Sequence, residues 1–185
     1  MTTGDRVLAP GEWAVLALLC ERPGHGWALA RQLTAGGELG AIWRMGRPLV
    51  YRSIDVLEQR HLVETAGHEP GSRGPNRTVF RATEEGRSAL ELWLGEPVEH
   101  VRDVRSLLLL KLVFARRLRL DPRPMLEAQH GAIDFALRSL ETRARDAVGS
   151  ERILLDFRLE STRAVLRFID GLLADESELR ARRAS

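Results

Sequence analysis

Arginine side chains cluster between residues 44 and 81, and their spacing indicates a surface that binds anions. This stretch holds seven arginines against four carboxylates, a local charge of +3, whereas the whole chain carries a formal net charge of only +2. A guanidinium group can donate paired hydrogen bonds to a phosphate or to O6 and N7 of guanine. An exposed arginine can equally be a solvated surface charge, and a tyrosine ring can pack half-buried against its own helix. The candidates for contact with an anionic partner are Arg44, Arg47, Tyr51, Arg52, Arg73 and Arg77.

The other reactive side chains form no catalytic or metal-binding motif. Cys20 is the only cysteine, which rules out an intrachain disulfide, and its apolar neighbours predict a small buried side chain. The five histidines lack the spacing of a zinc site, and the sequence contains no P-loop, nucleophile elbow or complete dinucleotide-binding fingerprint. We therefore expect no enzymatic activity, no metal and no cofactor.

The composition is that of a folded, mainly α-helical chain. Of the 185 residues, 44% are hydrophobic and 29% charged, while only 5% are aromatic. Long stretches mix alanine, leucine, glutamate and arginine, which are good helix formers. No apolar run is long enough to cross a bilayer, no secretory signal is visible, and a single cysteine fits a reducing compartment. We expect one domain or two small ones, in the cytoplasm and outside any membrane.

Three short helices are expected before residue 60. Apolar residues at helical spacing predict the first from Pro10 to residues 22–24 and the second over residues 27–33. Pro48 can occupy the first turn of the third helix, whose apolar stripe leaves Arg52 on another face. The residues of this stripe are Val50, Ile54 and Leu57.

A change to strand-like spacing follows the third helix. Residues 62–66 and 78–82 read as two strands, and the glycine- and proline-rich residues 67–77 between them are typical of a loop. Thr83 has the position of an N-cap for a fourth helix with two glutamates in its first turn, and Glu96-Pro97 ends that helix. These elements form a hairpin with a long tip, followed by a helix.

The rest of the chain carries only helical patterns. An apolar helix is expected over residues 101–118, and two longer helices follow it, separated by Gly149-Ser150. Apolar residues of both long segments alternate spacings of three and four, as in paired helices. Such seams pack against each other in an antiparallel hairpin or against a second chain, and we favour a dimerisation region over a monomeric helical bundle. The seam residues are Leu126, His130, Ile133, Leu137, Leu140, Ala144 and Ala147 in the first segment, and Leu155, Leu159, Thr162, Leu166, Ile169 and Leu173 in the second.

Three helices followed by a two-stranded hairpin is the element order of a winged helix-turn-helix. In that fold the third helix enters the major groove of DNA, and arginines of the wing contact the flanking phosphates. The predicted fold is mainly α, with a winged helix-turn-helix DNA-binding domain (helices plus a two-stranded β-wing) over residues 1–97 and a helical dimerisation domain over residues 98–185.

Three segments of the N-terminal half resemble the PadR family of transcriptional regulators. His25-Gly26-Trp27-Ala28-Leu29 resembles the family's HGY-E-I element, residues 48–63 resemble its recognition helix, and residues 77–87 (RTVFRATEEGR) resemble the strand and T-E-E-G-R element after the wing. The leucine-rich residues 107–115 also look like the start of its dimerisation region. The resemblance implies a homodimeric DNA-binding protein, usually a repressor, that is often released by a small aromatic or lipophilic effector.

Two residues depart from the pattern of that family. Many members have proline after the recognition-helix tyrosine, where this chain has Arg52, and they often have glycine where this chain has His61. Arg52 adds a cation on a turn that is expected to face DNA. The operator sequence therefore does not carry over from relatives.

The four tryptophans can serve as core residues or as a platform for a flat ligand. Trp13, Trp27 and Trp43 are expected in the core. Trp93 lies late in the fourth helix, close to the dimerisation segment, and is the candidate effector-binding residue.

The predicted function is that of a DNA-binding transcriptional regulator. We expect it to be a repressor that binds a pseudo-palindromic operator as a homodimer. Double-stranded DNA, a second copy of the chain and a small-molecule effector are the expected partners. The alternatives are a winged-helix module that binds another protein without specific DNA binding, and a small-molecule binding protein without a DNA function.

Overall fold

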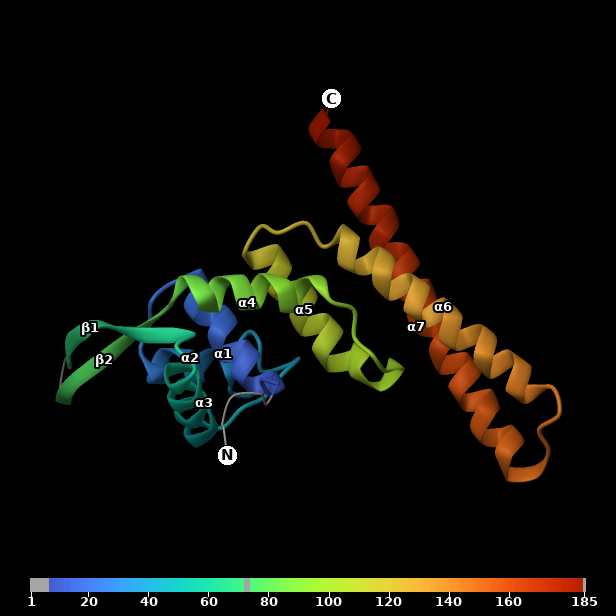
Figure 1. Ribbon diagram of the computed structural model, residues 1–185, viewed down its shortest axis with the longest axis horizontal. Helices are drawn as coiled ribbons and strands as arrows, with labels where there is room; N and C mark the ends of the chain where they lie inside the picture. The colour runs from blue at the N-terminus through green and yellow to red at the C-terminus, as the bar shows by residue number, and fades with distance from the viewer. Residues whose placement is uncertain (1–6, 72–73, 185) are drawn as a thin grey trace. The chain divides into compact units, whose positions relative to one another are not determined.

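The computed structural model describes residues 7–71 and 74–184, which form two compact units (Figure 1). We call residues 1–94 with 109–120 the head unit, and residues 95–108 with 121–185 the hairpin unit. The helices are α1 (Pro10–Glu21), α2 (Gly26–Leu33), α3 (Arg47–Gln59), α4 (Glu84–Gly95), α5 (Leu109–Arg117), α6 (Arg123–Ala144) and α7 (Gly149–Ala184), and the strands are β1 (Val63–Gly71) and β2 (Gly74–Ala82). The mainly α winged-helix fold predicted from the sequence is confirmed.

The head is built around α1, which is apolar on all sides. Every side chain from Ala14 to Cys20 is buried, as expected of a helix surrounded by other elements. At its N-terminus the Ala9 backbone N–H donates to the Glu12 carboxylate at 2.7 Å, where a negative charge is also favoured by the helix dipole. The stripe predicted for α3, Val50, Ile54 and Leu57, is buried in the same core.

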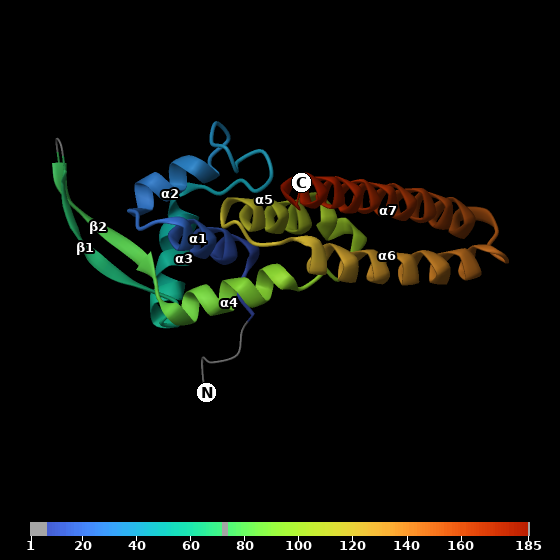
Figure 2. The ribbon, with the colours of Figure 1, turned by 90° about the horizontal axis from the view of Figure 1, so that it is seen from above.

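The wing is longer than the sequence predicted. β1 and β2 pair in antiparallel fashion out to Gly71 and Gly74, so most of the expected loop over residues 67–77 is strand (Figure 2). The prediction of a loop was wrong because two register shifts, after Thr65 and after Glu69, absorb the residues that interrupt the alternating pattern. At the first of them Gly67 has a φ of 153°, which only glycine adopts readily.

Two backbone hydrogen bonds attach the base of the wing to the start of α2. The Gly24 N–H donates to the Phe80 carbonyl and the Phe80 N–H donates to the Gly24 carbonyl, each at 2.9 Å. β2 is thereby fixed to the turn between α1 and α2.

The turn from α3 into the wing and the start of α4 are held together by one residue. The Thr83 hydroxyl accepts a hydrogen bond from the Gly86 N–H at 3.0 Å, which confirms Thr83 as the N-cap, and it donates to the His61 carbonyl at 2.7 Å. His61 has a φ of 59°, the left-handed conformation that follows many helices. This conformation accounts for the glycine that the PadR pattern has at this position.

The stretch expected as one helix over residues 101–118 is helical but not uniform. It runs through a 3₁₀ turn (Val101–Asp103), a π turn (Val104–Leu108) and then α5. Although α5 follows Pro97, where the domain boundary is predicted, it belongs to the head, and Phe114 is fully buried there. Lys111 is 3% exposed, donates to the Trp93 carbonyl and lies 4.4 Å from the centroid of the Trp93 ring.

The hairpin unit consists mainly of α6 and α7, which run side by side in opposite directions (Figures 1 and 2). Seam residues at both ends are buried between them, including Ile133, Leu155 and Ile169. The pairing of the two seams with each other is the first of the two arrangements that the sequence left open.

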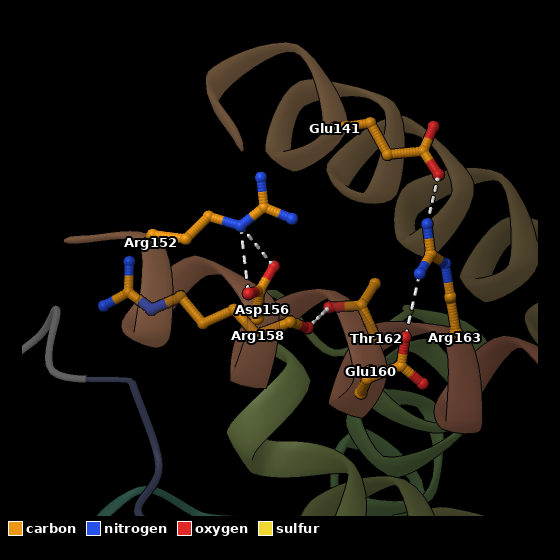
Figure 3. Close-up of polar contacts among 7 residues, drawn as sticks. All are labelled: Glu141, Arg152, Asp156, Arg158, Glu160, Thr162 and Arg163. Atoms are coloured by element: carbon orange, nitrogen blue, oxygen red, sulfur yellow. Dashed lines mark hydrogen bonds and ion pairs between the residues drawn. The ribbon is translucent and has the colours of Figure 1, made fainter. Parts of the chain in front are cut away.

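Polar contacts reinforce the α6–α7 seam. Arg163 of α7 donates to Glu141 of α6 at 3.0 Å and to Glu160 at 2.8 Å (Figure 3). The fully buried Gln129 side chain accepts from the Val98 N–H at 2.6 Å and donates to the Val98 carbonyl at 3.1 Å, so the segment after α4 is fixed to α6.

Within the described residues, no helix is both long and apolar enough to cross a membrane.

Candidate nucleic-acid interface

The outward face of α3 carries the polar and cationic residues that the sequence singled out. Burial of Val50, Ile54 and Leu57 turns the opposite face of the helix to solvent. Arg47, Tyr51 and Arg52 are all exposed there, within the first two turns. This is the part of a recognition helix that reaches base edges in helix-turn-helix proteins.

Leu49, which was not among the residues predicted to contact DNA, is also exposed on this face. An exposed leucine beside arginines can contact the methyl group of thymine. Its failure to fit the stripe of Val50, Ile54 and Leu57 was the signal that could have identified it.

Close packing against α2 fixes the position of the Tyr51 ring. A Cβ atom added to Gly26 would lie 2.6 Å from Cε1 of Tyr51, so the ring rests directly on the glycine. The Cδ1–Cε1 side of the Tyr51 ring is therefore occupied, while the side chain as a whole stays exposed. The ring of Tyr51 thus packs against α2, and contact of its hydroxyl with DNA stays a prediction.

The arginines of the head fall into two groups by their partners. Arg81 of β2 is paired with Glu64 at 2.8 Å, and Arg117 of α5 is paired with Glu21 at 2.7 Å. Arg44, Arg47 and Arg52, by contrast, are exposed and form no ion pair with any of the described residues. Charges without an intramolecular partner are the ones available to phosphates.

The wing contributes one described candidate. Arg77 is exposed on β2, opposite Glu69 in the strand register. Arg73 lies outside the described residues. Arg44 lies in the loop before α3.

Trp27 is not a core residue, and the expectation of its burial was wrong. It is 40% exposed at the second position of α2, because the buried face of that helix is formed by Leu29, Ala30 and Leu33. Trp13 and Trp43, by contrast, pack against the core of the head.

Two cationic side chains that were not predicted there surround Trp27. The Cζ atoms of Arg31 and Arg77 lie 5.4 and 5.6 Å from the centroid of the Trp27 ring, within the range of cation–π contacts. The signal for Arg31 was present in the sequence, since residues four apart on a helix are neighbours. Arg77 is distant in sequence and gave no such signal.

Trp93, the candidate for effector binding, already has aromatic and cationic neighbours. Its ring stacks on Trp13 with centroids 5.0 Å apart and an interplanar angle of 9°, and the Lys111 ammonium group lies close to it. The role of Trp93 in binding an effector stays a prediction.

Cys20 is buried in the head, as the sequence predicted. Burial raises the pKa of the Cys20 thiol to about 11, so the thiol stays protonated at neutral pH. No group of three or more histidine, cysteine, aspartate or glutamate side chains within residues 7–71 and 74–184 is placed to hold a metal ion.

Part of the chain is similar to known transcriptional regulators. Residues 15–92 match the transcriptional regulator PadR-like family. A curated Mycobacterium tuberculosis protein, described as the probable transcriptional regulator Rv1176c, is 29% identical over 93 residues, which are 50% of this chain and 48% of that protein. The chain thus spans about half the length of the curated relative that it matches.

Solved structures aligned with the chain include two PadR-type proteins. Bacillus subtilis PadR in complex with operator DNA gives a TM-score of 0.48 with 16% identity, over 91% of this chain and 99% of that chain. The PadR-like transcriptional regulator BC1756 from Bacillus cereus gives a TM-score of 0.38 with 18% identity, over 91% and 98%. The family match shows that residues 15–92 of this chain are similar to the PadR-like family of transcriptional regulators.

Proposed function

We propose that this chain is a DNA-binding repressor that reads a pseudo-palindromic operator as a homodimer. The observation that carries the proposal is the set of exposed arginines without ion-pair partners among the described residues: Arg47 and Arg52 on α3, Arg44 in the loop before it and Arg77 on β2. Within a winged-helix head, these positions face the major groove and the flanking phosphates. Two heads place their α3 helices in successive major grooves, about one helical turn apart.

In vitro selection from a random duplex library followed by fluorescence anisotropy tests DNA recognition. The wild-type protein should enrich a two-fold symmetric sequence and prefer it over a scrambled duplex. The Arg47→Ala/Arg52→Ala variant should lose that preference, because each bidentate base contact contributes about 1–3 kcal/mol of discrimination.

The matched control is Arg138→Ala, which removes one arginine from α6 that is paired with Asp134 at 2.9 Å. The control should bind as the wild type does. Failure of the library to enrich any sequence, with an unchanged thermal melt of the variants, would contradict the proposal and support a winged-helix module that binds protein.

An apolar stripe on α7 supports the homodimer. Ile153, Phe157 and Phe168 lie on one face of α7, opposite the seam that packs on α6, and the first two are 74% and 71% exposed. Phe135 of α6 is exposed to a similar degree. Large aromatic side chains are seldom left in water on this scale without a partner, and a second copy of the same hairpin offers the complementary surface.

Sedimentation velocity tests this part of the proposal. The wild type should sediment as a dimer at micromolar concentration, and Ile153→Ser/Phe157→Ser should shift it to the monomer. Val148→Ser is the control, because Val148 is equally exposed but lies in the turn before α7. A monomeric wild type would refute the dimer.

Release by a small aromatic or lipophilic effector completes the proposal. An effector lowers operator affinity only if it binds one conformation of the dimer better than the other. The stack of Trp13 on Trp93 supplies flat apolar surface that a ligand could extend. A ligand that weakens DNA binding should also quench the fluorescence of the wild type, and Trp93→Leu should abolish both effects.

A further inference from the structure

A cluster of four side chains, three exposed and one half-buried, lies at the point where the wing meets α2. It consists of Trp27 and Arg31 of α2, the N-cap residue His25, and Arg77 of β2. The guanidinium carbons of Arg31 and Arg77 lie 5.4 and 5.6 Å from the Trp27 ring centroid, and the His25 ring lies 6.1 Å from it, inclined by 30°. The indole ring thus contacts two cations from elements that are far apart in sequence.

The backbone holds this cluster in place. The reciprocal hydrogen bonds between Gly24 and Phe80 fix β2 against the residue before His25. His25 in turn caps α2, because its Nδ1 atom accepts from the Ala28 N–H at 3.2 Å. The His25 ring and the backbone of β2 that carries Arg77 are therefore held by contacts that do not depend on a ligand.

The capping bond determines which ring nitrogen of His25 carries the proton. A neutral imidazole whose Nδ1 accepts a hydrogen bond carries its proton on Nε2, which makes Nε2 a donor. Nε2 lies 3.5 Å from Nη1 of Arg77, which is also a donor. Two donors side by side cannot bond to each other, but an oxygen atom placed before them can accept from both.

Neither arginine of the cluster is neutralised by the protein. Arg31 and Arg77 form no ion pair with a carboxylate among the described residues, and Glu69, opposite Arg77 in the strand register, does not reach it. Arg81 of the same strand is paired with Glu64 at 2.8 Å. The positive charge of the wing base is therefore concentrated on the side of Trp27.

We infer that His25, Trp27, Arg31 and Arg77 form a clamp for the phosphate backbone of duplex DNA, in addition to the contacts of α3. The inference rests on the proposed function. His25 and Arg77 donate to one phosphate oxygen, Arg31 supplies a second charge, and Trp27 is a positioning residue that keeps the two guanidinium groups from spreading into solvent. Backbone contacts of this kind add affinity and orientation without sequence preference.

Salt-dependent anisotropy with a labelled duplex and a scrambled duplex tests the clamp. Each phosphate contact contributes a slope of about 0.9 to the fall of log K with log salt. Arg31→Gln/Arg77→Gln should therefore reduce the slope by about 1.8 and weaken both duplexes by the same factor. Arg81→Gln is the matched control, and its slope should equal that of the wild type.

Trp27 is tested with both arginines retained. Trp27→Leu should reduce the slope and the affinity, and Trp27→Tyr should restore them, because tyrosine also offers a ring face to a cation. A role of Trp27 in folding alone would lower the thermal melt but leave the salt slope of the folded protein intact.

The failure of the clamp and the failure of the proposed function look different. An unchanged slope in Arg31→Gln/Arg77→Gln, an equal loss in Arg81→Gln, or a wild-type slope in Trp27→Leu overturns the clamp while sequence-specific binding remains. A wild type that binds no duplex overturns both.

Discussion

Gly86, at the start of α4, is a position where an added methyl group should be strongly destabilising. A Cβ atom there would lie 2.0 Å from the Leu62 carbonyl oxygen and 3.2 Å from Cδ1 of Leu16. The oxygen belongs to the backbone and accepts from the Thr83 N–H at 3.1 Å, so it cannot move away without losing that bond. Overpacking costs about 1–3 kcal/mol, a lost hydrogen bond about 1 kcal/mol, and the better helix propensity of alanine returns up to about 1 kcal/mol.

Gly86→Ala should therefore lower the stability of the head by about 1–3 kcal/mol, or its melting temperature by at least about 4 °C. All four tryptophans lie in the head, so the melt followed by tryptophan fluorescence reports this unit. Gly36→Ala, in the loop after α2 and in the same unit, is the control, because no atom lies within 4 Å of the added Cβ, and it should leave the melt unchanged or raise stability by up to about 1 kcal/mol. A fluorescence melt of Gly86→Ala that coincides with that of the wild type would refute the steric argument.

Four further predictions follow from contacts described above. Gln129→Leu removes both hydrogen bonds to Val98, in the segment after α4, so the Val98 N–H should exchange with solvent faster than in the wild type. An unchanged exchange rate of this N–H would contradict the role of Gln129. Burial raises the pKa of Glu21, and Arg117 opposes that rise, so Arg117→Met should raise the pKa of Glu21 further. Because the folded state of this variant then favours the protonated carboxyl, its stability should fall as pH increases. The urea midpoint of the variant should lie further below that of the wild type at about pH 8 than at about pH 5, with a loss of about 3–5 kcal/mol at the higher pH. His61→Gly relieves a left-handed φ and should raise the urea midpoint, a gain of about 0.5–1 kcal/mol. Because burial raises the pKa of Cys20 to about 11, a thiol reagent at neutral pH should label Cys20 only in urea. Stability should decline as pH rises from about 9 towards 11, because the thiol ionises in the unfolded state before it ionises in the folded state. Rapid labelling of the native protein would contradict the burial of Cys20.

Features that depend on local sequence were predicted well. The cap at Thr83, the stripe of α3 and the α6–α7 seams follow from the spacing of a few neighbouring residues, and the structure contains all of them. The exposed arginines of α3 were found for the same reason, since a helix with one buried stripe must expose the residues between.

Features that depend on contacts between distant segments were not predicted. The length of the wing depends on register shifts in both strands, and these cannot be derived from either strand alone. The exposure of Trp27 depends on which side of α2 meets α3, and the ring's contact with Arg77 depends on the bond between Gly24 and Phe80. The assignment of α5 to the head depends on side-chain contacts such as that of Arg117 with Glu21.

The burial of Lys111 has a practical consequence for experiments on the intact protein. It is the only lysine in the chain, and its ammonium group is enclosed against Trp93. The cationic side chains exposed on the candidate interface are all guanidinium groups, which do not react with succinimidyl esters. Amine-directed labels should therefore leave this surface unmodified. Formaldehyde crosslinking to DNA through lysine side chains should be inefficient for the same reason. Photochemical or arginine-directed crosslinkers suit this protein better.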